Sequence, residues 1–252
     1  MRALTIAYIR LAAPLPACLL RARDWLRQHP EWWALAICAA AWLCLLSQTK
    51  GIGFASICRV GFNWRELGWT QARDGDLPLM TAAMMLPLAM GSARYAAFHS
   101  LWRRRHRAIA VFLCGYLGFW LAAAWLLDAA SALWLSAMND RSLSLAVAGF
   151  AASVWQLSPD KAAALAACHR GRALAPSGWP ADRDCLRYGL GNGATCLRSC
   201  WLLMLLPGAG GHDLAMMLGV TALASAERYR RPAAAAYAAA LLCLALWRAL
   251  AA

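Results

Sequence analysis

The sequence predicts an all-α protein: a polytopic transmembrane helix bundle of about seven spans, with the N-terminus inside and the C-terminus outside. Of the 252 residues, 62% are hydrophobic and 15% are charged, and the mean hydropathy is +0.48. A soluble domain is about a quarter charged. Apolar runs of about 20 residues, the length that crosses a bilayer core, recur along the chain. Lys and Arg gather on alternate connecting segments, as they do in membrane proteins.

Seven apolar runs are the candidate spans. The fourth is interrupted by the polar residues NDR, and the fifth contains Arg198. The last three are closely spaced, which predicts helical hairpins. The runs lie near residues 31–48, 77–98, 108–127, 129–155, 189–207, 212–227 and 233–250.

The distribution of basic residues sets the orientation. With the N-terminus inside, 19 of the 25 Lys and Arg fall on the inner side. Residues 1–30 are then a basic cytoplasmic arm, which we expect to be amphipathic and uncleaved, and residues 31–252 form the transmembrane domain. Basic inner segments such as WRRRHR (102–107) suit anionic lipid, so the net charge of +13 requires no nucleic-acid partner.

Two connecting segments carry further signals. Residues 49–76 form a long outer loop, rich in Gly and Trp, that is long enough to cap a site. Residues 156–172 contain a helix start, because Ser158 can cap, Pro159 fits the first helical position and Asp160 suits the positive end of the helix. A short helix at the inner surface would carry Cys168 and His169 near its end.

The ten cysteines predict free thiols or metal ligands. Six lie inside predicted spans, and Cys168 and Cys185 lie in an inner segment, where the compartment is reducing. Cys58 is in the outer loop, without an outer partner. We therefore expect no disulfide framework.

Cys196, Cys200 and Met204 recur every four residues in the fifth run, so a helix places them on one side. Thiolates and thioethers are soft ligands that favour Cu(I), and thiolates also bind zinc. This pattern predicts a metal site. The alternative is ordinary packing, because free Cys and Met also behave as small or adaptable apolar residues.

Other soft residues extend this set toward both faces of the membrane. In the predicted topology the outer half holds Met80, Met84, Met85 and His212, while Cys168 lies toward the inner face. The sequence thus predicts a ladder of soft ligands from one side to the other. Methionines that only fill gaps in the core are the competing interpretation.

Catalytic signals are weaker. The chain contains no HExxH, Walker or GxSxG pattern. The stretch GLGNG (189–193) precedes an apolar run rather than following a strand, so it predicts close helix packing or a local break instead of phosphate binding. Dithiol redox chemistry at Cys196 and Cys200 is a minor alternative, and we do not expect an enzyme.

Six segments, taken together and in this order, resemble a family: the bacterial predicted metal-binding integral membrane proteins of unknown function. The segments are MTAAMMLP (80–87), GYLGFW (115–120), QLSPDKAAALAACHR (156–170), CLRSCWLLM (196–204), GGHDLAMM (210–217) and AER (226–228). The resemblance covers residues 76–245 and implies a multi-pass protein of the bacterial inner (plasma) membrane. The chain departs from the family pattern at Ala164 and Ser199, where the family tends to have cysteine, and at His212, where it tends to have methionine. A site of four thiolates is therefore not expected.

The leading hypothesis is a membrane-embedded protein that binds a soft transition metal such as copper or hands it on. Its partners would be the lipid bilayer and a metal-handling or membrane-complex protein. A membrane scaffold or assembly partner without metal is the alternative. A membrane metalloenzyme is the third.

Overall fold

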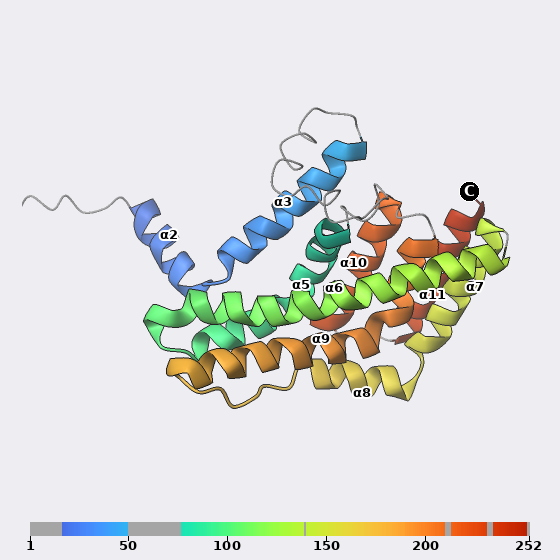
Figure 1. The fold of residues 1–252 in the computed structure, drawn as a ribbon. Helices are drawn as coiled ribbons and strands as arrows, with labels where there is room; N and C mark the ends of the chain where they lie inside the picture. The colour runs from blue at the N-terminus through green and yellow to red at the C-terminus, as the bar shows by residue number, and fades with distance from the viewer. Residues whose placement is uncertain (1–16, 50–76, 139, 210–212, 231–233, 251–252) are drawn as a thin grey trace, which may run out of the picture.

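The computed structural model describes residues 17–49, 77–138, 140–209, 213–230 and 234–250, and every regular element in these ranges is helical (Figure 1). The predicted all-α class is confirmed. The outer loop at 50–76 and His212 lie outside the described residues. The elements are α2 (Ala17–Gln28), α3 (Trp32–Thr49), α5 (Leu77–Phe98), the short 3-10 helix η2 (Trp102–Arg104), α6 (Arg105–Met138), α7 (Arg141–Gln156), α8 (Pro159–Cys168), α9 (Gly178–Ala209), α10 (Leu214–Arg230) and α11 (Ala234–Leu250).

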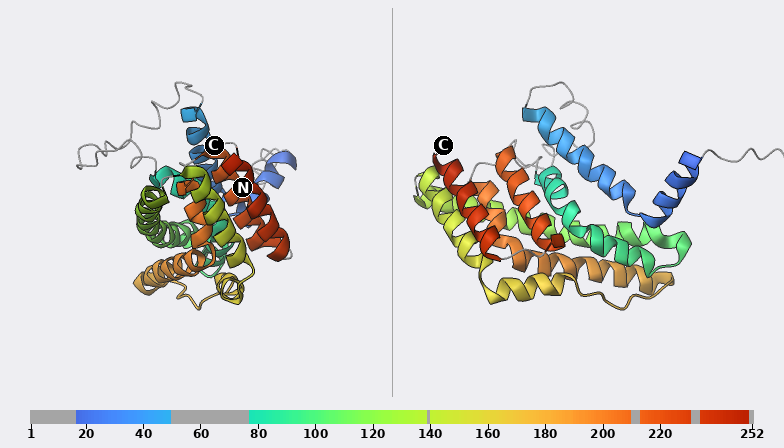
Figure 2. Two further views of the ribbon diagram at one scale, coloured as in Figure 1. Left: turned by 90° about the vertical axis from the view of Figure 1, so that its right-hand side faces the viewer. Right: turned by 180° about the vertical axis from the view of Figure 1, so that it is seen from behind.

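The two longest helices, α6 and α9, run side by side and form the most extensive helix–helix contact among the described residues (Figures 1 and 2). Their approach is close because glycines lie at the contact. A Cβ atom on Gly189 would lie 2.2 Å from the carbonyl oxygen of Phe112, and one on Gly193 would lie 2.8 Å from the Phe119 ring. The prediction that the GLGNG stretch permits close helix packing is therefore confirmed.

The remaining helices pack around the α6–α9 pair. Helices α7 and α11 pair with each other at one end, and α8 lies along α9 (Figure 1). Helix α5 packs against α6 and also against α3 and α10. Four helices, α6, α7, α8 and α10, thereby pack against α9.

Two helix starts follow from local capping. The Ser158 side chain accepts a hydrogen bond from the Asp160 backbone N–H, and Pro159 occupies the first helical position, so the predicted short helix is confirmed as α8. Asp140 caps α7 by accepting from the backbone N–H groups of Ser142 and Leu143. These two hydrogen bonds and one from the Ser142 hydroxyl lower the pKa of Asp140.

The predicted boundary between the third and fourth spans, near residue 128, was wrong. Helix α6 continues without a break through Asp128 to Met138, and the next helix begins at Arg141. The physical reason is that Asp128 is followed by helix-forming alanines, whereas the segment around Asp140 supplies a cap.

The count of seven spans is not supported. Of the described helices, the stretch Trp102–Met138 is the one long and apolar enough to cross a membrane by length and composition. Helix α9 has charged residues in its first half and Arg198 in its second, which shortens its apolar part. Helix α10 has only 17 residues and ends in charged ones. Shorter apolar helices cover Trp32–Ser47, Ser142–Gln156 and Ala234–Trp247.

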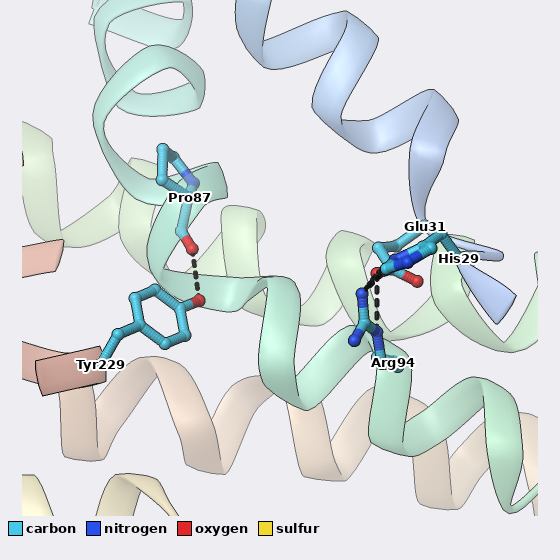
Figure 3. Close-up of polar contacts among 5 residues, drawn as sticks. All are labelled: His29, Glu31, Pro87, Arg94 and Tyr229. Carbon is cyan, nitrogen blue, oxygen red and sulfur yellow. Dashed lines mark hydrogen bonds and ion pairs between the residues drawn. The ribbon is translucent and has the colours of Figure 1, made fainter. Parts of the chain in front are cut away.

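Polar contacts hold α3 and α10 against α5 (Figure 3). The Arg94 guanidinium points at Glu31, with Nε 2.7 Å from Oε1, and its Nη2 also contacts His29. Glu31 is almost completely buried, at the start of α3. Further along α5, the Tyr229 hydroxyl donates to the carbonyl oxygen of Pro87 at 2.7 Å.

Free thiols are the rule among the described cysteines, with one exception. Cys38, Cys114, Cys168, Cys185, Cys196, Cys200 and Cys243 are free. Cys44 is disulfide-bonded, so the expectation that the cysteines are free thiols or metal ligands was wrong at this residue. Cys44 lies near the C-terminal end of α3.

Candidate metal centre

Two thiols lie together in the middle of α9. Cys196 and Cys200 are four residues apart, their Sγ atoms are 3.8 Å apart, and both side chains are almost fully buried. The Cys200 thiol also donates to the Cys196 carbonyl oxygen one turn earlier, at 2.7 Å. The predicted stripe therefore exists as a sulfur pair inside the protein rather than on its surface.

A phenol from the neighbouring helix contacts this pair. Tyr116 of α6 is completely buried and donates its hydroxyl proton to the Cys196 Sγ at 3.4 Å. On the other side, the indole N–H of Trp155 in α7 donates to the Ser199 carbonyl oxygen at 3.3 Å. The surroundings of the sulfur pair are thus fixed by α6 and α7 as well as by α9.

Cys168, at the end of α8, is the third buried thiol of this region. A hydrogen bond with Cys196, together with burial, raises the pKa of Cys168 well above its ordinary value, so the thiol is protonated when no metal is bound. The adjacent His169 is not free to bind. Its Nδ1 lies 2.9 Å from the Leu165 carbonyl oxygen, and its Nε2 lies 2.9 Å from that of Arg228.

A cavity of about 60 Å³ lies between α5, α6, α9 and α10, and five of the residues that line it are methionines. Four of its methionines are the predicted Met80, Met84, Met85 and Met204. The structure therefore brings together, on α5 and α9, residues that are more than a hundred positions apart in the sequence. The other lining residues are Leu77, Thr81, Trp120, Ala124, Leu127, Asp128, Ser131, Pro207, Gly208 and Met217.

The cavity and the thiols are one helical turn apart. Cys200 and Met204 lie four residues apart on α9, so their Cβ atoms are about 6 Å from each other. Tyr116 and Trp120 are likewise four residues apart on α6: Tyr116 contacts Cys196, and Trp120 lines the cavity. The soft donors thus form two adjacent groups, which we name the thiol cluster (Cys168, Cys196 and Cys200) and the methionine cavity (the five methionines above).

The described side chains do not form a ready-made classical metal site. Among them, no three His, Cys, Asp or Glu residues are placed to hold a metal ion together. The donors that the structure does gather are sulfurs, including thioethers, and these suit Cu(I) better than they suit hard ions.

Sequence reasoning missed several residues of this region. Met217 was noted next to His212, but without a ligand role. Tyr116 lies in the GYLGFW segment, but its contact with Cys196 was missed, because the two positions are 80 residues apart in the sequence. Three ionisable residues in or beside the apolar runs are also engaged within the protein: Asp128 lines the methionine cavity, Glu227 pairs with Lys161 at 2.9 Å and Arg94 pairs with Glu31.

The basic WRRRHR segment is largely engaged within the protein. Arg104 and Arg107 both bind Asp182 of α9, at 2.5 and 2.7 Å. The Arg105 guanidinium lies 3.9 Å from the centroid of the Trp102 ring. Part of the charge assigned to lipid contact therefore fixes the start of α6 against α9.

An all-α chain with buried thiols next to a methionine-lined cavity is, by its chemistry, suited to a soft metal ion. The chain matches the PpoB2 copper chaperone family over residues 78–251 and belongs to this family. The matched region agrees with residues 76–245, for which the sequence motifs predicted a metal-binding family. Comparison with curated proteins and with solved structures found no match.

Proposed function

We propose that the protein binds Cu(I) through the thiol cluster, exchanges it with the methionine cavity and hands it to a second metal-handling protein. The observation that carries this proposal is the position of Cys200 and Met204, one turn apart on α9, with the thiols on one side and the cavity on the other. Membership of a copper chaperone family supports the choice of metal.

The two groups of donors suit different tasks. Thiolates hold Cu(I) tightly, whereas neutral thioethers form a softer, more easily exchanged set of ligands. Met80 and Met204 are half-buried, while Cys196 and Cys200 are buried, so an ion reaching the cavity meets exchangeable ligands first. In this proposal the cavity is the entrance and the thiol cluster is the holding site.

Membrane embedding is part of the proposal. Support comes from large apolar side chains exposed on long helices, such as Leu126 (74% exposed) and Leu133 (72%) on α6 and Phe150 (61%) on α7. Exposure of such large apolar side chains along two helices fits contact with lipid. Resistance to extraction from bacterial membranes by alkaline carbonate would support embedding, and release into the soluble fraction would refute it.

The proposal is tested by metal analysis of the full-length chain, purified in detergent, kept reduced and loaded with Cu(I). The variant is Cys196→Ser/Cys200→Ser, because serine keeps a hydroxyl that can replace the hydrogen bonds but is a poor soft ligand. The matched control is Cys114→Ser/Cys243→Ser, which removes two exposed free thiols.

We expect stoichiometric copper in the parent and in the control, and a loss of tightly held copper in the Cys196/Cys200 variant. Negligible copper in all three proteins would refute the proposal. In that case the alternative leads: a scaffold or assembly partner in which the sulfurs only pack helices.

A further inference from the structure

Arg228, near the C-terminal end of α10, is a buried cation without an acidic partner. Arg228 is 5% exposed, and no carboxylate among the described residues forms an ion pair with its side chain. The neighbouring Glu227 pairs with Lys161 instead, at 2.9 Å. A buried guanidinium is costly unless other groups compensate its charge, so this arrangement needs a physical reason.

The polar groups around Arg228 are neutral. Its Nη2 atom lies 3.3 Å from three oxygens: the Cys168 carbonyl, the Asn192 side-chain carbonyl and the Ser92 hydroxyl. Asn192 in turn donates to the Ser92 hydroxyl. These contacts fix the guanidinium between α5, α8 and α9, but they leave its positive charge uncancelled.

The charge lies beside the thiol cluster. Arg228 interacts electrostatically with both Cys168 and Cys196. Its own backbone carbonyl oxygen also contacts the Nε2 atom of His169, the residue after Cys168. Side chain and backbone of Arg228 thus hold the end of α8, and with it the Cys168 thiol, against the sulfur pair of α9.

The charge balance of metal binding accounts for this cation. When two thiols bind one Cu(I) ion, two S–H bonds break, two S–Cu bonds form and two protons leave for the solvent. The product carries two negative charges and one positive charge, and hence a net charge of −1. A buried anion of this kind is stable only beside a fixed positive charge. A divalent ion held by the same two thiolates would be neutral, and Arg228 would then be left unbalanced.

We infer that Arg228 is the counter-charge of the thiol cluster: a positioning residue, not a ligand, that favours a monovalent soft ion over a divalent one. This inference rests on the proposed function. It adds a residue on a third helix, α10, to a site that the sequence places on α8 and α9.

The experiment compares the full-length parent with Arg228→Gln, which removes the charge but keeps a hydrogen-bond donor, and with Arg228→Lys, which keeps the charge. Arg198→Gln is the matched control, because Arg198 is exposed on the same helix as Cys196 and Cys200. Dissociation constants for Cu(I) and for Zn(II) are measured under reducing conditions by competition with chromophoric chelators. Thermal unfolding of the metal-free proteins is followed in parallel.

We expect Arg228→Gln to weaken Cu(I) binding about ten- to a hundredfold, as the loss of outer partners does at other metal sites. Zn(II) binding should not weaken, Arg228→Lys should recover most of the Cu(I) affinity, and Arg198→Gln should match the parent. A purely structural role predicts instead that both metals bind more weakly and that lysine does not rescue.

Unchanged Cu(I) affinity in Arg228→Gln, or equal losses for both metals, would overturn the inference while leaving the proposed function standing. If Arg228→Gln does not fold, Arg228→Lys decides: a folded lysine variant that has lost Cu(I) affinity also overturns it. A parent that binds no Cu(I) would overturn the proposed function and this inference with it.

Discussion

The thiol of Cys38 in α3 lies 3.5 Å from the carbonyl oxygen of Ala83 in α5. Pro87, four residues after Ala83, has no N–H group, so this carbonyl lacks its usual partner within the helix. The Cys38 thiol of α3 therefore donates the hydrogen bond that the proline in α5 cannot supply. The Pro87 carbonyl oxygen is satisfied in turn by the Tyr229 hydroxyl of α10.

We predict that Cys38→Ala lowers the free energy of unfolding by about 1–2 kcal/mol, because a buried carbonyl oxygen loses its donor. Thermal unfolding followed by circular dichroism measures this change. Cys243→Ala, which removes an exposed thiol from α11, is the control and should have no measurable effect. Equal stability of the Cys38→Ala variant and the parent would show that the hydrogen bond from the thiol to the Ala83 carbonyl oxygen contributes no stability.

The contact between α6 and α9 gives a second prediction. Gly189→Ala should destabilise the fold by about 1–3 kcal/mol, since its Cβ would lie 2.2 Å from the Phe112 carbonyl oxygen and the two helices would have to separate. Gly191→Ala is the matched control, because a Cβ there meets no atom within 4 Å. That substitution should stabilise α9 by about 0.8–1 kcal/mol through helix propensity. Similar melting temperatures for the two variants would contradict the packing argument.

The ion pair between Lys161 and Glu227 gives a third prediction. It joins α8 to α10, with side-chain exposures of 2% and 11%. Burial lowers the pKa of Lys161, and attraction by Glu227 opposes this change. Because removing one partner leaves a buried charge alone, Lys161→Met should cost about 3–5 kcal/mol.

The double variant Lys161→Met/Glu227→Leu should regain most of that stability, since apolar residues can replace a buried ion pair at little cost. Chemical unfolding of the parent, the two single variants and the double variant forms the thermodynamic cycle. Additive losses in the double variant would show that the two side chains do not depend on each other.

The sequence predicted the helices better than their contacts. The run at 77–98 matches α5, and the cap formed by Ser158 places the start of α8, because both signals are local. The boundary near Asp128 was missed, since an acidic residue alone does not end a helix. Helical periodicity predicts that Cys196 and Cys200 lie on one face of α9. The contact of Cys196 with Tyr116 depends on which faces of α6 and α9 meet. The sequence pattern of one helix does not contain this information.

The same limit explains the methionine cavity. Periodicity places Met80 and Met84 on one face of α5 and Met204 on α9, but only the folded chain shows that these faces meet around one cavity. Arg228 was counted as an inner-side charge. Its burial beside Cys168 became visible only once α8 and α10 were placed together.

A final prediction concerns the methionine cavity as an entrance for copper. The triple variant Met80→Leu/Met84→Leu/Met204→Leu removes three thioethers with little change in volume, so each substitution should cost less than about 1.5 kcal/mol of stability. Because the thiol cluster is untouched, its equilibrium affinity for Cu(I) should stay close to that of the parent. Loading should slow about tenfold, which corresponds to about 1.4 kcal/mol in the barrier.

Stopped-flow absorption of the copper–thiolate bands measures the loading rate, and equilibrium competition with a Cu(I) chelator measures the affinity. The control triple variant changes Met90, Met138 and Met216, none of which lines the cavity, to leucine. Slower loading in the cavity variant alone supports passage of copper through the methionines to Cys200. If both triple variants load at the parent's rate, copper reaches the thiol cluster by another route and the cavity methionines serve packing.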